Sequence, residues 1–264
     1  MKLNINIKKT LLVCIDAVIG CYLFMAFTSW HKPADISQQC TKVVINIADD
    51  KVNGFLNSDD VKALLVKKGT YPISKSITDI NPRRIEDQLV GMPFVKTAQC
   101  YITTEGHVFI SLTQNIPVAR VKSSKGEDYY VDANGGVMPN SQYTSDMVIV
   151  TGDVSRTYAN RYIAPLADAI MADDLWRNQV EQINILGDLS VELVPRVGDH
   201  IINIGPLPLA SDDAKRKERI KEYVDKQLKR LELFYRYGLS HAGWNKYDYI
   251  SLEYTNQIVC RKRE

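Results

Sequence analysis

The sequence of 264 residues predicts an α+β protein in which a single transmembrane helix precedes two domains outside the membrane. Three observations support this class. An apolar segment of about 20 residues, long enough to cross a bilayer, stands near the N-terminus. Strand and helix patterns then follow in the order β-α-α-β-β. The remainder of the chain is rich in short strand patterns and also contains long helical segments.

The apolar segment covers residues 11–30, and Asp16 is its only formal charge. Three lysines lie in the preceding tail, residues 1–10. By the positive-inside rule, these lysines predict a single-pass protein whose N-terminus is cytoplasmic and whose remainder is periplasmic. Trp30 stands where an aromatic anchor at the membrane interface is expected. An ionised Asp16 costs up to about 3 kcal/mol at mid-bilayer. Either solvation of the carboxylate or a polar contact with a partner's transmembrane helix would relieve that cost.

Two cleaved forms compete with this interpretation. A cleaved signal peptide has a shorter apolar core before a small-residue site, and only Ala26-Phe27-Thr28 resembles such a site. Val18-Ile19-Gly20-Cys21 resembles a lipoprotein processing box, but the apolar run continues past the cysteine. We therefore expect an uncleaved anchor.

A linker over residues 31–41 leads to a first predicted domain over residues 42–122. Asn57 or Ser58 is a suitable N-cap for its first helix, and Gly69 is a suitable stop. Asn81-Pro82 begins the second helix, with asparagine as cap and proline in the first turn. The predicted elements are, in order, a strand over 43–47, a helix over 57–68, a helix over 81–90, and strands over 95–103 and 108–113.

The second predicted domain covers residues 123–264. Asn134-Gly135 indicates a hairpin with a two-residue loop. The most regular element is a helix over 212–237, capped by Ser211 and the acids after it. Its apolar side chains recur at three- and four-residue steps, at Ile220, Val224, Leu228 and Leu231. The other predicted elements are strands over 147–150, 180–186, 189–195 and 200–204, and a helix over 158–171 that is crossed by Pro165.

The chain closes with a predicted strand over 249–260, in which apolar and polar residues alternate. A strand that ends a domain often lies at a sheet edge, where a partner's strand can pair with its backbone. Arg261-Lys262-Arg263 after it either protects the edge against aggregation or faces an acidic partner. The candidate partner-binding residues are Ile250, Leu252, Tyr254, Asn256 and Ile258.

Charge and cysteine usage narrow the function classes. Three of the 33 basic residues and one of the 31 acidic residues lie in residues 1–30, so the remainder carries 30 of each. A neutral ectodomain argues against nucleic acid as a partner, because phosphate binding requires a basic surface. Cys40, Cys100 and Cys260 lie outside the apolar segment. They lack the spacing of a disulfide framework, so we expect buried free thiols.

The sequence lacks the motifs of catalytic and metal sites. His31, His107, His200 and His241 are scattered singly, without a metal-ligand spacing. Nucleophile elbows, dinucleotide fingerprints and phosphate-binding loops are absent. Paired acids stand at helix starts and turns, where capping explains them. We therefore expect no enzymatic activity, no cofactor and no metal.

Five motifs carry a resemblance to a known family: Phe55–Val61, Met92–Ala98, Gln114–Arg120, Tyr130–Val137 and Ile250–Tyr254. Together with the layout of the chain, these motifs resemble the FtsQ/DivIB family of bacterial division proteins, in particular a Bacteroidetes-like branch. The β-α-α-β-β unit resembles a POTRA domain, and a β-rich domain with long helices follows it. Ser251 and Glu253 depart from the family's frequent aspartate and arginine, and Tyr254 is the best single match in the last strand.

The resemblance implies a non-enzymatic scaffold of the divisome in the cell inner membrane at the division septum, linking early and late division proteins. It further implies that the POTRA domain recruits an FtsK-like translocase. The second domain would bind the FtsB–FtsL coiled-coil pair. The alternatives are a membrane-tethered POTRA chaperone or secretion adaptor and, less well supported, an extracytoplasmic sensor.

Overall fold

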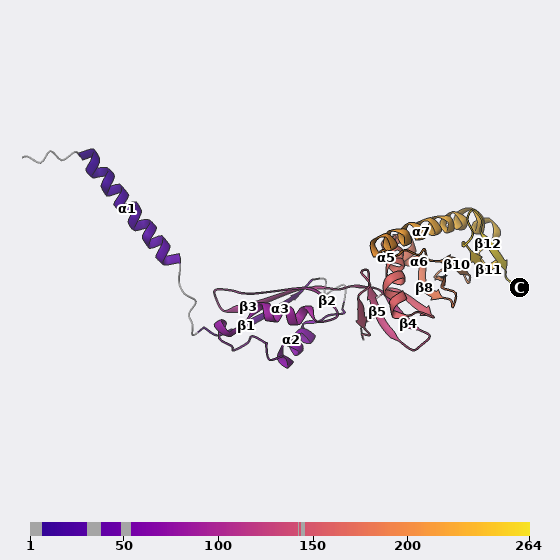
Figure 1. Cartoon of the computed structure of the whole chain (residues 1–264), viewed down its shortest axis with the longest axis horizontal. Helices are drawn as coiled ribbons and strands as arrows, with labels where there is room; N and C mark the ends of the chain where they lie inside the picture. Colours follow the sequence, from indigo (N-terminus) through magenta and orange to yellow (C-terminus); the bar gives the residue numbers. More distant parts are fainter. Residues whose placement is uncertain (1–6, 31–37, 49–53, 142, 144–145) are drawn as a thin grey trace, which may run out of the picture.

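The computed structural model describes residues 7–30, 38–48, 54–141, 143 and 146–264 (Figure 1). Residues 1–6 of the predicted tail and residues 31–37 of the predicted linker lie outside this part, as does the side chain of Trp30. Helix α1 covers Ile7–Trp30. Among the described residues, no helix combines the length and hydropathy needed to cross a membrane. The predicted segment is thus confirmed as a helix and not as a membrane span.

The first domain has the predicted β-α-α-β-β order. Its three-stranded sheet has the order β1-β3-β2, with β1 parallel and β2 antiparallel to β3. Both predicted caps are present: Asn57 accepts a hydrogen bond from the Asp60 N–H at 2.8 Å, and Asn81 from the Arg84 N–H at 3.1 Å. The elements are β1 (Lys42–Ile47), α2 (Ser58–Lys67), a short 3-10 helix (Ile77–Asp79), α3 (Pro82–Val90), β2 (Val95–Ile102) and β3 (His107–Gln114).

The second domain is built on a nine-stranded sheet with the order β12-β11-β10-β9-β8-β7-β4-β5-β6. Buried side chains of α5, α6 and α7 join those of the strands in one core, and Figure 1 shows α7 running alongside the sheet. The strands are β4 (Pro117–Ser123), β5 (Asp128–Asp132), β6 (Val137–Pro139), β7 (Val148–Gly152), β8 (Val180–Ile185), β9 (Ser190–Pro195), β10 (Ile201–Pro206), β11 (Tyr247–Ser251) and β12 (Val259–Lys262). The helices are α4 (Arg156–Tyr158), a π-helical turn (Ala159–Ile163), α5 (Ala164–Ala172), α6 (Asp174–Gln179), α7 (Asp213–Phe234), a second π-helical turn (Tyr235–Leu239) and α8 (Ser240–Ala242).

The structure moves the predicted domain boundary. Residues 117–122, placed in the first domain, form most of β4, which pairs with β5 and β7 in the nine-stranded sheet. The predicted boundary falls inside β4, because residues 117–122 were not recognised as a strand. In the structure, Pro117 is the first residue of one, where its missing N–H is tolerated.

The hairpin predicted at Asn134-Gly135 joins β5 and β6, but its loop is longer than predicted. The Asp132 N–H donates to the Gly136 carbonyl at 3.0 Å, which leaves three loop residues, Ala133–Gly135. The carboxylate of Asp132 accepts the N–H of Asn134 at 2.7 Å and that of Gly136 at 2.8 Å. This local side-chain bonding stabilises the three-residue loop.

Pro165 lies within the predicted helix over 158–171, and a π-helical turn accommodates it. The Ala164 N–H donates to the Ala159 carbonyl, a bond five residues back. The turn places Pro165 in the first turn of α5, where a missing N–H breaks no helical hydrogen bond.

An aromatic cluster joins the two domains. Phe55 and Phe94 of the first domain stack with ring centroids 5.3 Å apart. Phe55 also meets the edge of Tyr130, on β5 of the second domain, at 5.4 Å, and that of Tyr143 at 4.8 Å. Phe55, Tyr130 and Met138 are buried. We refer to Phe55, Phe94, Tyr130, Met138 and Tyr143 as the aromatic joint.

Candidate functional site at the edge of the sheet

The C-terminal segment is a hairpin and not the predicted single strand over 249–260. β11 ends at Ser251, and β12 returns antiparallel to it, with Ile250 opposite Cys260 and Ser251 opposite Val259. The Leu252 N–H donates to the Asn203 carbonyl of β10 at 2.7 Å, after which the chain leaves the sheet. Asn256 lies in the turn with a φ of 64°, in the left-handed region.

β12, and not β11, is therefore the last strand of the sheet. β11 lies between β10 and β12, whereas β12 has a neighbour on one side only within the part of the chain that the structure describes. The unpaired backbone groups of β12 are the feature that a partner strand can use.

The hairpin divides the predicted partner-binding residues into two groups. Ile250 and Leu252 are completely buried in the core of the second domain, so they do not face a partner. Tyr254 is 51% exposed in the turn, and Asn256 is exposed beside it. Ile258 is half-buried and packs against the core immediately before β12. The predicted alternation ends at Leu252, because the residues after it no longer follow an extended backbone.

Arg230, on α7, fixes the turn between β11 and β12. Its guanidinium donates to the carbonyls of Leu252 at 2.8 Å, Tyr254 at 2.9 Å and Gln257 at 2.7 Å. The buried Gln227, one turn earlier, donates to the Leu252 carbonyl at 3.2 Å. One side chain thus binds three carbonyls of the turn that presents Tyr254 and leads into β12.

A shallow apolar hollow of about 460 Å³ lies between this turn and the end of α7. Leu233 and Tyr237 border it and are both exposed, and Ile258 forms part of its wall. The hollow is continuous with the beginning of β12, because Val259 follows Ile258 directly. An apolar surface next to open backbone groups is the combination that strand-adding partners use for affinity and register.

The backbone of β12 presents alternate N–H groups to opposite sides. The Arg263 N–H donates to the Lys246 carbonyl at 3.0 Å, toward β11. Since neighbouring residues of a strand alternate, the N–H of Lys262 points away from β11, to the open edge.

The predicted basic run, Arg261 to Arg263, is largely paired within the domain. Arg261 donates to Asp248 at 2.8 Å, and this hydrogen bond lowers the pKa of the Asp248 carboxyl below its usual range. Arg263 lies 3.3 Å from Asp199. Lys262 has no carboxylate within ion-pair distance among the described residues, so it is the member of the run that is available to an acidic partner.

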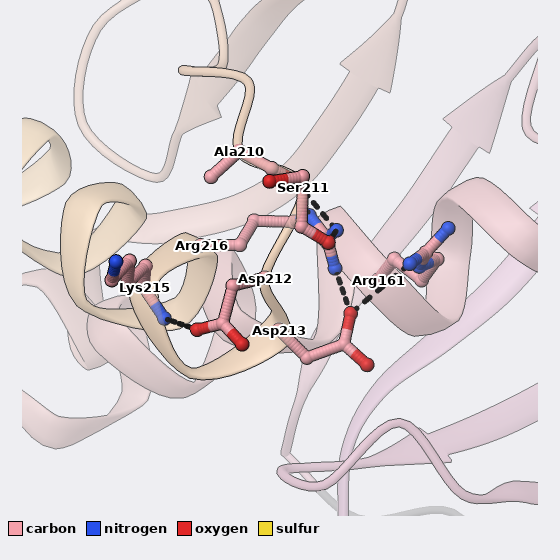
Figure 2. A network of polar contacts seen from close by, with 7 residues as sticks. All are labelled: Arg161, Ala210, Ser211, Asp212, Asp213, Lys215 and Arg216. Carbon is pink, nitrogen blue, oxygen red and sulfur yellow. Dashed lines mark hydrogen bonds and ion pairs between the residues drawn. The ribbon is translucent and has the colours of Figure 1, made fainter.

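The other end of α7 is fixed by the polar network in Figure 2. Asp212, and not the predicted Ser211, is the N-cap and accepts the Lys215 N–H at 2.9 Å. Arg216 is only 3% exposed, pairs with Asp213 and donates to the carbonyl of Ala210 at 2.7 Å. These contacts hold the first turn of the helix whose last turns support the candidate interface.

The histidines that the structure describes do not gather into a site, and His31 lies outside the described residues. His200 is buried and forms a 2.7 Å hydrogen bond to the Tyr235 hydroxyl. His107 lies 3.7 Å from the exposed Glu105. Within the described ranges, no three His, Cys, Asp or Glu side chains stand close enough to hold a metal ion. Cys40 and Cys100 are buried free thiols, as predicted, whereas Cys260 is free but only half-buried.

A family model described as "FtsQ/DivIB, C-terminal related" matches residues 116–261, which is more than half of the chain. The chain belongs to the FtsQ/DivIB family. A POTRA-like domain model matches residues 38–113, so this FtsQ/DivIB-type protein carries a POTRA domain before its family-specific domain. No curated protein matches the chain. Membership confirms the resemblance and implies a role in bacterial cell division, in a family of non-enzymatic proteins.

Proposed function

We propose that this FtsQ/DivIB-type protein is a non-enzymatic scaffold of the divisome. In this proposal α1 anchors it in the cytoplasmic membrane with the N-terminus inside, and both domains lie in the periplasm at the division septum. The scaffold links early and late division proteins through protein–protein contacts. The three lysines of the tail and the apolar segment over 11–30 support the topology.

One observation carries the proposed mechanism: the domain that matches the family ends in an edge strand with an open backbone. A segment of an FtsB–FtsL-like coiled-coil pair adds to β12 as a further strand. Main-chain hydrogen bonds supply affinity, and side chains set the register. Tyr254, Asn256 and Ile258 flank this edge, whereas Ile250 and Leu252 hold the hairpin in the core.

The proline test must use a residue of β12. Asn256 has a φ of 64°, which proline cannot adopt, so Asn256→Pro would disrupt the turn itself. Lys262→Pro removes an N–H that points to the open edge, where proline is tolerated in a folded domain. Lys262→Ala is the matched control, because it removes the same side chain and keeps the N–H.

We expect Lys262→Pro to weaken binding of the FtsB–FtsL pair from the same organism by about tenfold or more, and Lys262→Ala to weaken it much less. Affinity is measured on the full-length chain in detergent, with a melting curve for each variant. Full-strength binding by a Lys262→Pro variant that melts like the parent protein would exclude strand addition at β12.

In the same proposal the POTRA domain recruits an FtsK-like translocase component. The alternative is a membrane-tethered POTRA chaperone or secretion adaptor, which also uses sheet edges. Imaging of the tagged chain separates these functions. A midcell band is expected for a division scaffold, and an even signal around the envelope would favour the adaptor.

A further inference from the structure

A second apolar hollow, of about 260 Å³, lies on the other side of the last turns of α7. Trp176 of α6, Tyr235 of the second π-helical turn and Trp244 form its walls. Leu175 and Val197 stand at its rim. We refer to these five residues as the tryptophan socket.

Ring contacts and one buried hydrogen bond shape the socket. The centroid of Tyr235 lies 6.2 Å from that of Trp176 and 5.1 Å from that of Trp244. The Tyr235 hydroxyl is bonded to the buried His200 at 2.7 Å. Gly198, at a φ of 90°, lies against the imidazole of His200, and a Cβ there would lie 2.7 Å from Nδ1 of that ring. The walls are therefore preorganised, which lowers the entropy cost of filling the hollow.

Exposed apolar side chains stand at the rim, and Gln179 and the Glu232–Arg236 ion pair also line the hollow. Leu175 is 45% exposed, Val197 47% and Trp244 38%. Isolated apolar side chains are common on protein surfaces, whereas a group of large ones around a hollow indicates an interaction surface. The hollow is smaller than the pockets of about 300–1,000 Å³ that hold drug-sized ligands. Its size therefore fits one bulky side chain.

The topology places the socket beside the end of β12. The Arg263 N–H donates to the carbonyl of Lys246, two residues after Trp244. The Arg263 guanidinium donates to the Asp199 carbonyl at 3.0 Å, in the same β9–β10 connection as Val197. A segment that leaves a strand paired with β12 at this end passes next to the socket.

Two lysines at this end indicate the charge of the occupant. Lys262 stands opposite Tyr247 in the hairpin, and Lys246 precedes Tyr247. Neither lysine has a carboxylate within ion-pair distance in the described part of the chain. An acidic residue of a partner would pair with them, and an apolar residue next to it would fill the socket.

We infer that the tryptophan socket anchors an aromatic or large aliphatic side chain of the partner segment that pairs with β12, next to an acidic residue of that segment. The inference rests on the proposed function and names the chemistry of its partner. Buried bulky anchors of this kind carry much of the affinity of an interface.

The test places carboxylates at the mouth of the socket. The double variant Leu175→Glu/Val197→Glu changes only partly exposed side chains, and Leu209→Glu, at an exposed leucine away from the socket, is the matched control. The full-length chain is titrated with the FtsB–FtsL pair of the same organism. We expect the double variant to lose about tenfold or more in affinity and the control to bind as the parent protein does.

A folded double variant that binds at full strength would contradict the anchoring role of the socket. Lys262→Pro then decides whether strand addition at β12 holds without that anchor. Weak binding by the double variant together with full-strength binding by Lys262→Pro supports the socket as an anchor but contradicts its coupling to β12. If both variants bind normally, neither the anchoring role of the socket nor strand addition at β12 holds.

Lys246→Glu/Lys262→Glu should also weaken binding and reduce its salt dependence. An unchanged affinity there would exclude the acidic residue.

Discussion

At the residue scale, Arg230 connects the candidate interface to α7. Its guanidinium binds three carbonyls of one turn, and hydrogen bonds to charged groups contribute more than neutral ones. We expect Arg230→Ala to lower the free energy of unfolding by about 2 kcal/mol and to speed hydrogen exchange in residues 252–257. Arg230→Lys should recover little of this loss, because an ammonium group lacks the planar fork that reaches several carbonyls.

The matched control for Arg230 is Arg236, the second residue of the π-helical turn that follows α7. An ion pair joins the exposed Arg236 to the half-buried Glu232, and pairs at the surface contribute about 0–1 kcal/mol. Denaturant unfolding and exchange mass spectrometry of both alanine variants give the comparison. An Arg230→Ala protein that matches Arg236→Ala in both measurements would show that the turn does not depend on the guanidinium.

His200 gives a prediction on pH. Burial, assisted by the nearby Arg263 and opposed by Asp199, lowers the pKa of His200 below its ordinary value of 6.5. The unfolded chain therefore binds a proton at a higher pH than the folded chain, and protonation favours unfolding. The contribution of His200 to stability is complete above pH 6.5 and decreases as the pH falls below it.

We therefore expect the melting temperature of the parent protein to fall more between pH 7.5 and 5.5 than that of His200→Gln. The other three histidines are common to both proteins and cancel in the difference. Parallel melting curves over this range would contradict the assignment.

Which residues can be understood from the sequence depends on how local their contacts are. Asn57 and Asn81 cap the helices that follow them, so their roles were predicted correctly. Arg230 escaped prediction because its acceptors lie 22 to 27 residues away, in a turn that only the folded hairpin creates. Tyr254, the expected family match in the last strand, stays a prediction, as does its contact with a partner.

At the element scale, the missed hairpin has a definite cause. The segment between β11 and β12 contains neither glycine nor proline, the strongest turn signals. Asn256 supplies the left-handed residue of the turn instead. Because apolar and polar residues continue to alternate as far as Tyr254, the sequence pattern did not reveal that the chain reverses direction there. β12 is short and basic, which is unlike a buried strand but usual for a protected edge.

A substitution of Gly152, at the end of β7, tests how closely β7 and β8 approach each other. The φ of Gly152 is 98°, and an added Cβ would clash with the carbonyl oxygen of Ile185 on β8. Backbone atoms of a central strand cannot move aside, so we expect Gly152→Ala to cost about 3 kcal/mol or more.

Gly126 is the control, with a φ of 84° and open space around the position of a Cβ. Gly126→Ala should cost only the left-handed backbone penalty, about 1–2 kcal/mol. Urea unfolding of the two variants separates steric from conformational cost. Equal losses would show that β7 and β8 can move apart.

At the scale of the whole molecule, the aromatic joint determines how the POTRA domain and the β-rich domain meet. Its residues lie in segments that the sequence assigns to different domains, between residues 55 and 143, so no local pattern could pair them. A polar contact supports the joint: the side chain of Asn115 donates to Asp132 of the β5–β6 hairpin at 2.7 Å. In a scaffold, a fixed orientation of the two domains would hold a partner bound to one domain in a defined position relative to a partner bound to the other.

Phe55→Ala tests this coupling. Phe55 is buried between both domains, and removal of a buried phenylalanine ring costs about 3–5 kcal/mol. Because Tyr130 and Met138 lose their neighbour, hydrogen exchange should rise across residues 128–139 of the second domain, although the substitution lies in the first. Phe109→Ala is the control, since Phe109 stacks on Tyr101 within the first domain, with centroids 5.3 Å apart.

Phe109→Ala should leave exchange in residues 128–139 unchanged, even where it lowers the stability of the first domain. Calorimetry of the full-length chain adds a second measurement: we expect the two domains of Phe55→Ala to unfold in more clearly separated transitions than those of the parent protein. If residues 128–139 stay protected in Phe55→Ala and the transitions do not separate, the joint is a contact without coupling. The two domains would then have to be treated as independent binding units on one chain.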